Sequence, residues 1–125
     1  MGAAVGAETI EQIEALPRSA TSVRVARLDD AKALALSRRR ELQCIIGDGN
    51  PVISDDGLGL LAELPLLKVL DLEWCSTITD AGLEKLKNLR QLRWLDLSYC
   101  RGLSDSAVEK LRSSLSECKI DADGV

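Results

Sequence analysis

Residues 69–86 read VLDLEWCSTITDAGLEKL, and residues 94–111 read WLDLSYCRGLSDSAVEKL. The apolar and cysteine positions around the first stretch recur 25 residues later without a shift. They are Leu67, Leu70, Leu72, Cys75, Ile78, Leu83 and Leu86, which become Leu92, Leu95, Leu97, Cys100, Leu103, Val108 and Leu111. A fixed period of this length is typical of repeat architectures, in which each unit buries its apolar side against its neighbours.

The period extends beyond these two copies. A weaker copy ends in ISDDGLGLL at residues 53–61, although Gly47 replaces a strand leucine and Asn50 stands at the cysteine position. We expect Asn50 to fill its turn through hydrogen bonds, as cysteine does through its weak S–H donor. Degenerate strand matches flank the copies at residues 20–25 and 115–120, so we predict about five strands.

Each unit has a strand half and a helix half. The segment LKVLDLEW at residues 67–74 alternates apolar and polar residues, which is the period of a strand. The segment TDAGLEKLKNL at residues 79–89 places leucines at steps of three along one side of a helix, and Thr79 or Asp80 can cap its start. At the N-terminus, ETIEQIEAL at residues 8–16 predicts a short helix that covers the first strand.

The two quoted stretches resemble leucine-rich repeats of the cysteine-containing type, most strongly over residues 42–111. The resemblance implies an α/β fold: a right-handed solenoid with a parallel sheet on its concave face and helices on its convex face. It implies one domain, made of a capping helix (1–19), a degenerate repeat (20–41), three repeats (42–66, 67–91 and 92–114) and a terminal strand and tail (115–125). For function, it mostly implies protein–protein binding.

Composition narrows the classes of function. The 125-residue chain has a net charge of −4, which disfavours nucleic-acid binding because such proteins usually carry a basic excess. Histidine is absent, and no phosphate loop or nucleophile motif appears, so we predict neither an enzyme nor a cofactor. No apolar stretch reaches 18 residues and no signal peptide is recognisable, which predicts a cytoplasmic protein without a membrane span.

The four cysteines predict neither a metal site nor a disulfide framework. Cys44, Cys75, Cys100 and Cys118 form no C-x-x-C pair and have no histidine to share a zinc ion with. We therefore expect buried, reduced thiols that act as small apolar residues.

The strand residues between the leucines are predicted to point outward on the concave face. The outward set is Cys44, Ile46, Asp48, Val69, Asp71, Glu73, Trp94, Asp96 and Ser98, and Trp74 and Tyr99 follow where two strands end. Aromatic side chains ringed by charge are typical of protein-binding hot spots, and an acidic surface favours a partner with a basic segment. The candidate partner-binding residues are Asp48, Val69, Asp71, Glu73, Trp74, Trp94, Asp96 and Tyr99.

Two alternatives remain open at this stage. The aspartates can be ordinary solvated strand residues, with Trp74 and Tyr99 stacked as a structural ladder. The rival function is that of a structural or assembly subunit whose solenoid ends make the contacts, because the final rung around Cys118 and Ile120 is predicted to be exposed. The sequence leaves the oligomeric state open.

Overall fold

The computed structural model describes residues 4–125. Its strands are β1 (Val5–Ala7), β2 (Ser22–Ala26), β3 (Cys44–Asp48), β4 (Val69–Asp71), β5 (Trp94–Asp96) and β6 (Lys119–Asp121). Its helices are α1 (Ile10–Glu14), α2 (Asp30–Ser37), α3 (Asp55–Leu61), α4 (Asp80–Glu84) and α5 (Asp105–Ser114). None of these helices is long and apolar enough to cross a membrane.

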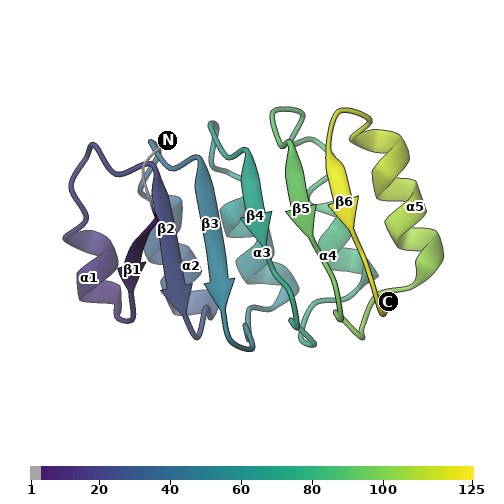
Figure 1. The fold of residues 1–125 in the computed structure, drawn as a ribbon, viewed down its shortest axis with the longest axis horizontal. Coiled ribbons are helices and arrows are strands. Elements are labelled where there is room, and N and C mark those ends of the chain that lie inside the picture. The colour runs from purple at the N-terminus through teal and green to yellow at the C-terminus, as the bar shows by residue number, and fades with distance from the viewer. Residues whose placement is uncertain (1–3) are drawn as a thin grey trace.

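Strands and helices alternate to form a solenoid. The six strands form one parallel sheet in chain order, and the helices lie on one side of it (Figure 1). Each passage from a strand through its helix to the next strand is right-handed, as expected for parallel connections (Figure 1). This architecture confirms the predicted α/β solenoid. We refer to the side of the sheet without helices, which was predicted to be concave, as the open face.

The number of strands differs from the prediction. The sheet has six strands rather than about five, because β1 pairs with β2 in the register Val5 to Val23. The predicted helix over residues 8–16 is present as α1, whose start is closed by a capping box between Thr9 and Gln12. Strand β1 was not predicted because three residues with a central glycine are too few to display an alternating pattern.

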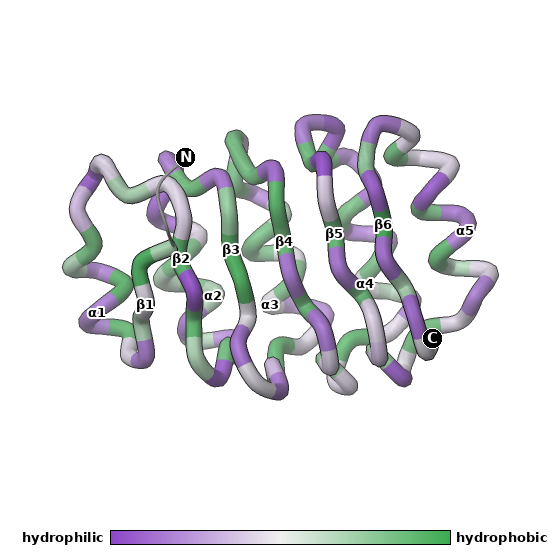
Figure 2. Tube along the Cα trace, viewed as in Figure 1, coloured by the Kyte–Doolittle hydropathy of each residue, from purple (hydrophilic) through white to green (hydrophobic). Residues whose placement is uncertain are grey.

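The core lies between the sheet and the helices. Ile45, Leu70 and Leu95 are in register on neighbouring strands, and all three are completely buried. Figure 2 shows β3 as apolar over most of its length, whereas β4 begins apolar and ends hydrophilic. Leu70 and Leu95 lie under the sheet, between it and the helices, whereas the polar residues beside them lie on the open face.

A residue with left-handed backbone conformation follows each of the strands β2 to β6. Positive φ angles occur at Arg27 (52°), Gly49 (72°), Trp74 (68°), Tyr99 (61°) and Gly124 (71°), and the last four are 25 residues apart. Glycine adopts this conformation freely, whereas a bulky side chain is strained in it. Two turns of the solenoid therefore carry an aromatic residue at a position that suits glycine better.

The cysteine positions behave as predicted in two repeats and differently in the third. Cys75 and Cys100 are unpaired and completely buried, and their Sγ atoms lie 3.7 and 3.1 Å from the carbonyl oxygens of Ile53 and Leu72. Asn50 is exposed, and its side chain forms no hydrogen bond to any described residue, so its predicted turn-filling role is wrong. The neighbouring Pro51 is buried and fills this turn with an apolar ring instead.

Carboxylates at the helix starts connect neighbouring units. Asp55 accepts hydrogen bonds from both the N–H (2.8 Å) and the hydroxyl (2.6 Å) of Thr79, which caps the next helix. The same double contact joins Asp30 to Ser54 and Asp80 to Ser104. Because each contact spans 24 residues, this aspartate ladder fixes the spacing of one helix relative to the next.

Candidate functional site

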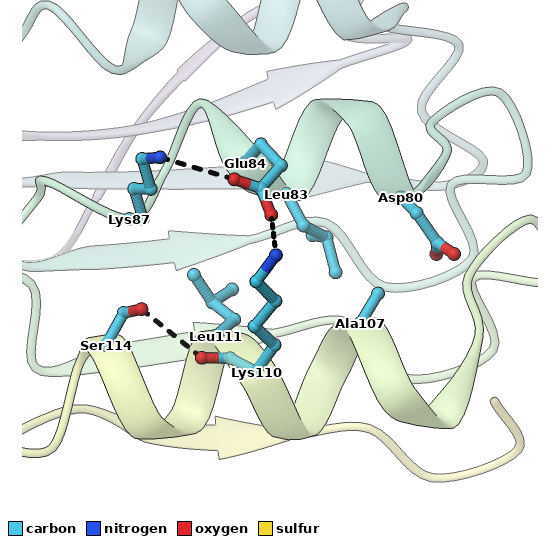
Figure 3. Close-up of a pocket in the computed structure, with 8 residues that line it drawn as sticks. All are labelled: Asp80, Leu83, Glu84, Lys87, Ala107, Lys110, Leu111 and Ser114. Atoms are coloured by element: carbon cyan, nitrogen blue, oxygen red, sulfur yellow. Dashed lines mark hydrogen bonds and ion pairs between the residues drawn. The ribbon is translucent and has the colours of Figure 1, made fainter.

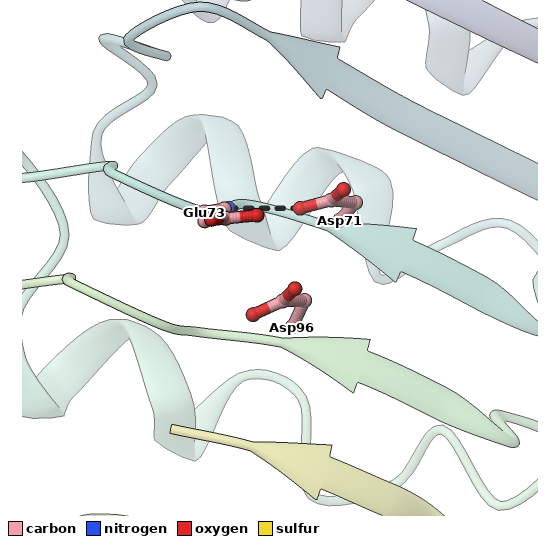
Figure 4. A group of neighbouring side chains, drawn as sticks. All are labelled: Asp71, Glu73 and Asp96. Carbon is pink, nitrogen blue, oxygen red and sulfur yellow. Dashed lines mark hydrogen bonds between the residues drawn. The ribbon is translucent and has the colours of Figure 1, made fainter. Parts of the chain in front are cut away.

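A row of aspartates crosses the open face. Asp71, Asp96 and Asp121 are in register on β4, β5 and β6, and Glu73 lies two residues beyond Asp71. One oxygen from each of Asp71, Glu73 and Asp96 lies within 4.8 Å of the others. We call these three residues the acidic cluster (Figure 4).

The acidic cluster accepts backbone hydrogen bonds but has no counter-charge among the described residues. Asp71 accepts the N–H of Glu73 (3.0 Å), and Asp96 accepts the N–H of Ser98 (2.9 Å). Within residues 4–125, no lysine or arginine forms an ion pair with the cluster. Partial burial, together with the nearby negative charges, raises the pKa of both Asp71 and Glu73. The cluster is therefore short of positive charge.

A basic residue beside the cluster is already engaged. Arg24 on β2 forms an ion pair with Asp48 on β3, with 2.7 Å between Nη1 and Oδ1. This pair stands next to the cluster, because Ile46 lies in register with both Arg24 and Asp71. Arg24 pairs with Asp48 alone, so this guanidinium forms no ion pair with the three carboxylates of the acidic cluster.

Three residues of the predicted outward set are buried. Asp96 is 8% exposed, Ser98 is 5% exposed and Cys44 is 9% exposed. They do stand on the open face, but parallel strands are only about 4.8 Å apart, so flanking side chains cover a short one from both sides. Cys44, for example, lies in register between Ser22 and Val69.

An aromatic stack stands at the strand ends beside the acidic cluster. The rings of Trp74 and Tyr99 are 4.3 Å apart between centroids and are tilted by 12°. The two residues remain 43% and 37% exposed. Tyr99 also packs on the turn at Gly124, where an added methyl group would lie 2.6 Å from the tyrosine Cδ1. The structural-ladder interpretation thus describes a contact that exists, but the stack is still open to solvent.

Trp94 lies apart from this stack. It sits at the start of β5 and donates its indole N–H to Asp121 Oδ2 at a distance of 2.8 Å. Val69 is its partner in register on β4, and both residues are half-buried. Trp94 and Val69 therefore lie at the start of their strands, and the aromatic stack lies beyond the other end of the same strands.

Sequence reasoning missed two participants on the open face. Arg24 belongs to the site through its ion pair with Asp48, and Asp121 continues the aspartate row. The 25-residue period could have found Asp121, since it is one period beyond Asp96. No comparable signal could have found Arg24, because the repeat that carries it is shorter and degenerate.

A hollow opens between the ends of β3 and β4. It has a volume of about 390 Å³, and its lining includes Arg24, Asp48, Gly49, Asp71, Glu73 and Trp74. Gly49 lines the hollow without a side chain, and a methyl group added there would have no neighbour within 4 Å. We call this space the Trp74 hollow.

The chemistry of the open face suits a positively charged ligand. Carboxylate oxygens are the ligands that hard cations prefer, so the acidic cluster could hold such an ion. Exposed acidic groups of this kind are also common without a metal. An organic cation has the additional attraction of the Trp74 ring, because a cation is stabilised over an indole face.

A second depression, between α4 and α5, differs in its charge balance (Figure 3). It has a volume of about 200 Å³. Glu84 lies between Lys87 (3.4 Å) and Lys110 (3.1 Å), and these two lysines lower its pKa. Leu83 and Leu111 also line the depression. Its acidic and basic side chains neutralise one another, so this depression has no excess charge that would attract a ligand.

One comparison with known proteins identifies the repeat. A family model described as a leucine-rich repeat matches residues 63–87, which contain β4 and α4. No curated protein matches this chain. With the six-stranded parallel sheet, the match shows a leucine-rich-repeat solenoid; the cysteine-containing subtype stays a prediction. Leucine-rich repeats generally mediate protein–protein interactions and are generally not enzymes.

Proposed function

We propose that this leucine-rich-repeat solenoid binds a protein partner through the open face of its sheet. The contact surface would comprise the aromatic stack, the acidic cluster and the neighbouring strand residues Asp48, Val69 and Trp94. The partner would present a basic segment, since the acidic surface would attract it and speed its approach. Neither catalysis nor a bound cofactor forms part of this proposal.

The observation that carries the proposal is the exposed aromatic stack. Trp74 and Tyr99 occupy left-handed turn positions at which the neighbouring repeats have Gly49 and Gly124. Strained backbone conformations are concentrated at binding and catalytic sites, where function maintains them against their cost in stability. Tryptophan and tyrosine are also the residues most enriched in interface hot spots. Two exposed aromatic residues on strained backbone, beside carboxylates that no described cation pairs with, fit a binding surface better than a purely structural one.

Affinity purification with quantitative mass spectrometry tests the proposal, followed by titration calorimetry with each purified candidate. The test variant is Trp74→Gly with Tyr99→Gly, because glycine holds the same turn in the neighbouring repeats. The control variant is Lys87→Ala with Lys110→Ala on the helix side. We expect the test variant to lose the partner and the control to keep it. Equal binding of the same partner by wild type and test variant would refute a role for the open face.

A structural or assembly role is the second candidate. Strands β1 and β6 stand at the two sides of the sheet and are each paired on one edge. A free edge can pair with a strand of another chain. Light scattering over a concentration series measures this directly: growth in mass with concentration would support assembly through the ends, and a constant monomer mass would count against it.

We also propose an intracellular location for the protein. Cys44, Cys75, Cys100 and Cys118 are free thiols, and such proteins are typical of reducing compartments. Burial raises the pKa of Cys100 to about 12, which suppresses the reactive thiolate. Thiol labelling of the native protein should therefore be slow at this residue and should become fast on denaturation.

A further inference from the structure

The charges around the Trp74 hollow do not balance. Asp48 is paired with Arg24, whereas the acidic cluster has no cation within residues 4–125. The hollow is lined by Asp71 and Glu73 of the cluster and lies open to solvent. Its volume of about 390 Å³ falls within the range of roughly 300–1,000 Å³ that is usual for ligand clefts.

The aromatic stack is closed at one end and open at the other. Tyr99 is covered by Trp74 on one side and packs on the Gly124 turn on the other. Trp74 is covered by Tyr99 on one side, and its other side borders the hollow, where Gly49 contributes no side chain. An indole face and two carboxylates thus border one vacant space.

We propose that the Trp74 hollow is a seat for a single arginine side chain of the protein partner. The guanidinium would lie flat against the side of the Trp74 ring that Tyr99 does not cover. It would donate hydrogen bonds to the carboxylates of Asp71 and Glu73. This inference rests on the proposed function, since it names the group of the partner that the open face recognises.

Arginine fits this seat better than lysine does. A guanidinium is planar and stacks on an aromatic ring, and its fork of N–H donors can reach two carboxylates at once. A lysine ammonium is a compact, strongly hydrated point charge without a flat surface. The ion pair of Arg24 with Asp48 on the neighbouring strands already joins a guanidinium to a carboxylate of this face.

Nuclear magnetic resonance titration tests the seat without knowledge of the partner. The probes are blocked Gly-Arg-Gly, Gly-Lys-Gly and Gly-citrulline-Gly peptides, and citrulline is the neutral analogue of arginine. We expect the arginine peptide to shift the Trp74 indole N–H and the Gly49 amide saturably, to bind several-fold more tightly than the lysine peptide and to weaken with added salt. Citrulline should give no saturable shift. Equal responses to arginine and citrulline, or no response to arginine, would overturn the proposal.

Two variants assign the effect to named residues. Asp71→Asn with Glu73→Gln removes both counter-charges and should weaken arginine binding by roughly tenfold. Glu11→Gln with Asp105→Asn removes the same charge from exposed helix positions and should leave binding unchanged. If both variants weakened arginine binding equally, the effect would come from the net charge of the protein, and a specific seat would be refuted.

Three further outcomes distinguish an arginine seat from a metal site, and a wrong seat from a wrong binding face. Calcium chloride that shifts the Asp71 and Asp96 amides, with no response to the arginine peptide, would assign the cluster to a metal and overturn the seat. If the partner still depends on the aromatic stack while the arginine peptide fails, the seat alone is wrong. If the arginine peptide binds as expected while the partner ignores the open face, the proposed function is wrong.

Discussion

The protein carries two sets of acidic side chains that obey the same 25-residue period but meet opposite surroundings. At the helix starts, Asp55 and Asp80 each receive an N–H and a hydroxyl from the next unit. On the open face, Asp71 and Asp96 lie side by side with Glu73, and no cation of residues 4–125 pairs with them. Hydrogen bonds from Ser104 lower the pKa of Asp80, whereas burial and like charges raise the pKa of Asp71.

The contrast teaches how a repeat can serve two purposes with one residue type. A carboxylate that receives donors from the following unit joins the repeats, so it contributes to the stability of the solenoid. On the open face, the carboxylates of successive repeats lie side by side on adjacent strands and repel one another. This repulsion lowers the stability of the fold unless a ligand neutralises the charge. We therefore expect the aspartate ladder to be structural and the acidic cluster to be available for binding.

The largest expected effect comes from the core that both sets share. Leu70→Ala should lower the free energy of unfolding by about 2–5 kcal/mol, because a completely buried leucine leaves a cavity between β4 and the helices. Urea unfolding monitored by circular dichroism measures this change. Leu66→Ala removes a leucine that is 46% exposed, and it should cost far less. Equal costs for the two variants would contradict the assignment of the core.

A smaller loss is expected from the ladder. Asp55→Ala removes a charged acceptor for two donors of Thr79 and should cost about 1–3 kcal/mol. Asp105→Ala is the matched control, because Asp105 occupies the same repeat position, is exposed and accepts no such pair within residues 4–125. Chemical unfolding of both variants compares them. A cost at Asp105 as large as that at Asp55 would contradict the ladder.

The acidic cluster should respond in the opposite direction. Asp71→Asn keeps the oxygen that accepts the Glu73 N–H but removes a charge from the cluster, so we expect stability to rise by about 0.5 kcal/mol at neutral pH. Glu84→Gln removes a charge that two lysines neutralise and should lower stability. Melting temperatures at low salt check the opposite signs. A loss of stability in Asp71→Asn would show that its charge is already compensated.

The smallest effect is a difference in pH dependence. The pKa values of Asp71 and Glu73 are raised, so their contribution to stability is full below their ordinary pKa values of 3.8 and 4.5 and is lost as pH rises through the raised values. The lowered pKa values of Asp80 and Glu84 act in reverse: their contribution is present above the ordinary values and is lost as pH falls through the lowered ones.

Melting curves between pH 7 and pH 3 test this sign. The wild type should gain a little stability as pH falls from 7 through the raised pKa values of Asp71 and Glu73, before stability is lost at more acidic pH. The double variant Asp71→Asn with Glu73→Gln should lack this gain but should still lose stability at acidic pH. A gain of the same size in wild type and double variant would assign it to other groups.

The sequence predicted the repeating part of the molecule well and its irregular parts poorly. Leu70 and Leu95 indicated the strands, because residues one period apart lie side by side on adjacent strands of a parallel sheet and are buried together. Strand β1 and the exposure of Asn50 escaped prediction, since neither follows the repeat. The partner-binding role of the candidate residues on the open face stays a prediction. The burial of Asp96 was not predicted, because it depends on side chains of the neighbouring strands, which are about one repeat away in the sequence.

The sequence by itself determined the unit of this protein: a strand, a turn and a helix, repeated at a distance that aligns like residues on adjacent strands. That period alone brings Asp71 beside Asp96 and Trp74 beside Tyr99. Only the tertiary structure decided which acidic residues receive hydrogen bonds or ion pairs from the neighbouring repeat. Hydrogen bonds and ion pairs depend on donors supplied by the next unit, and the donors that reach Asp55 and Asp80 do not reach the open face.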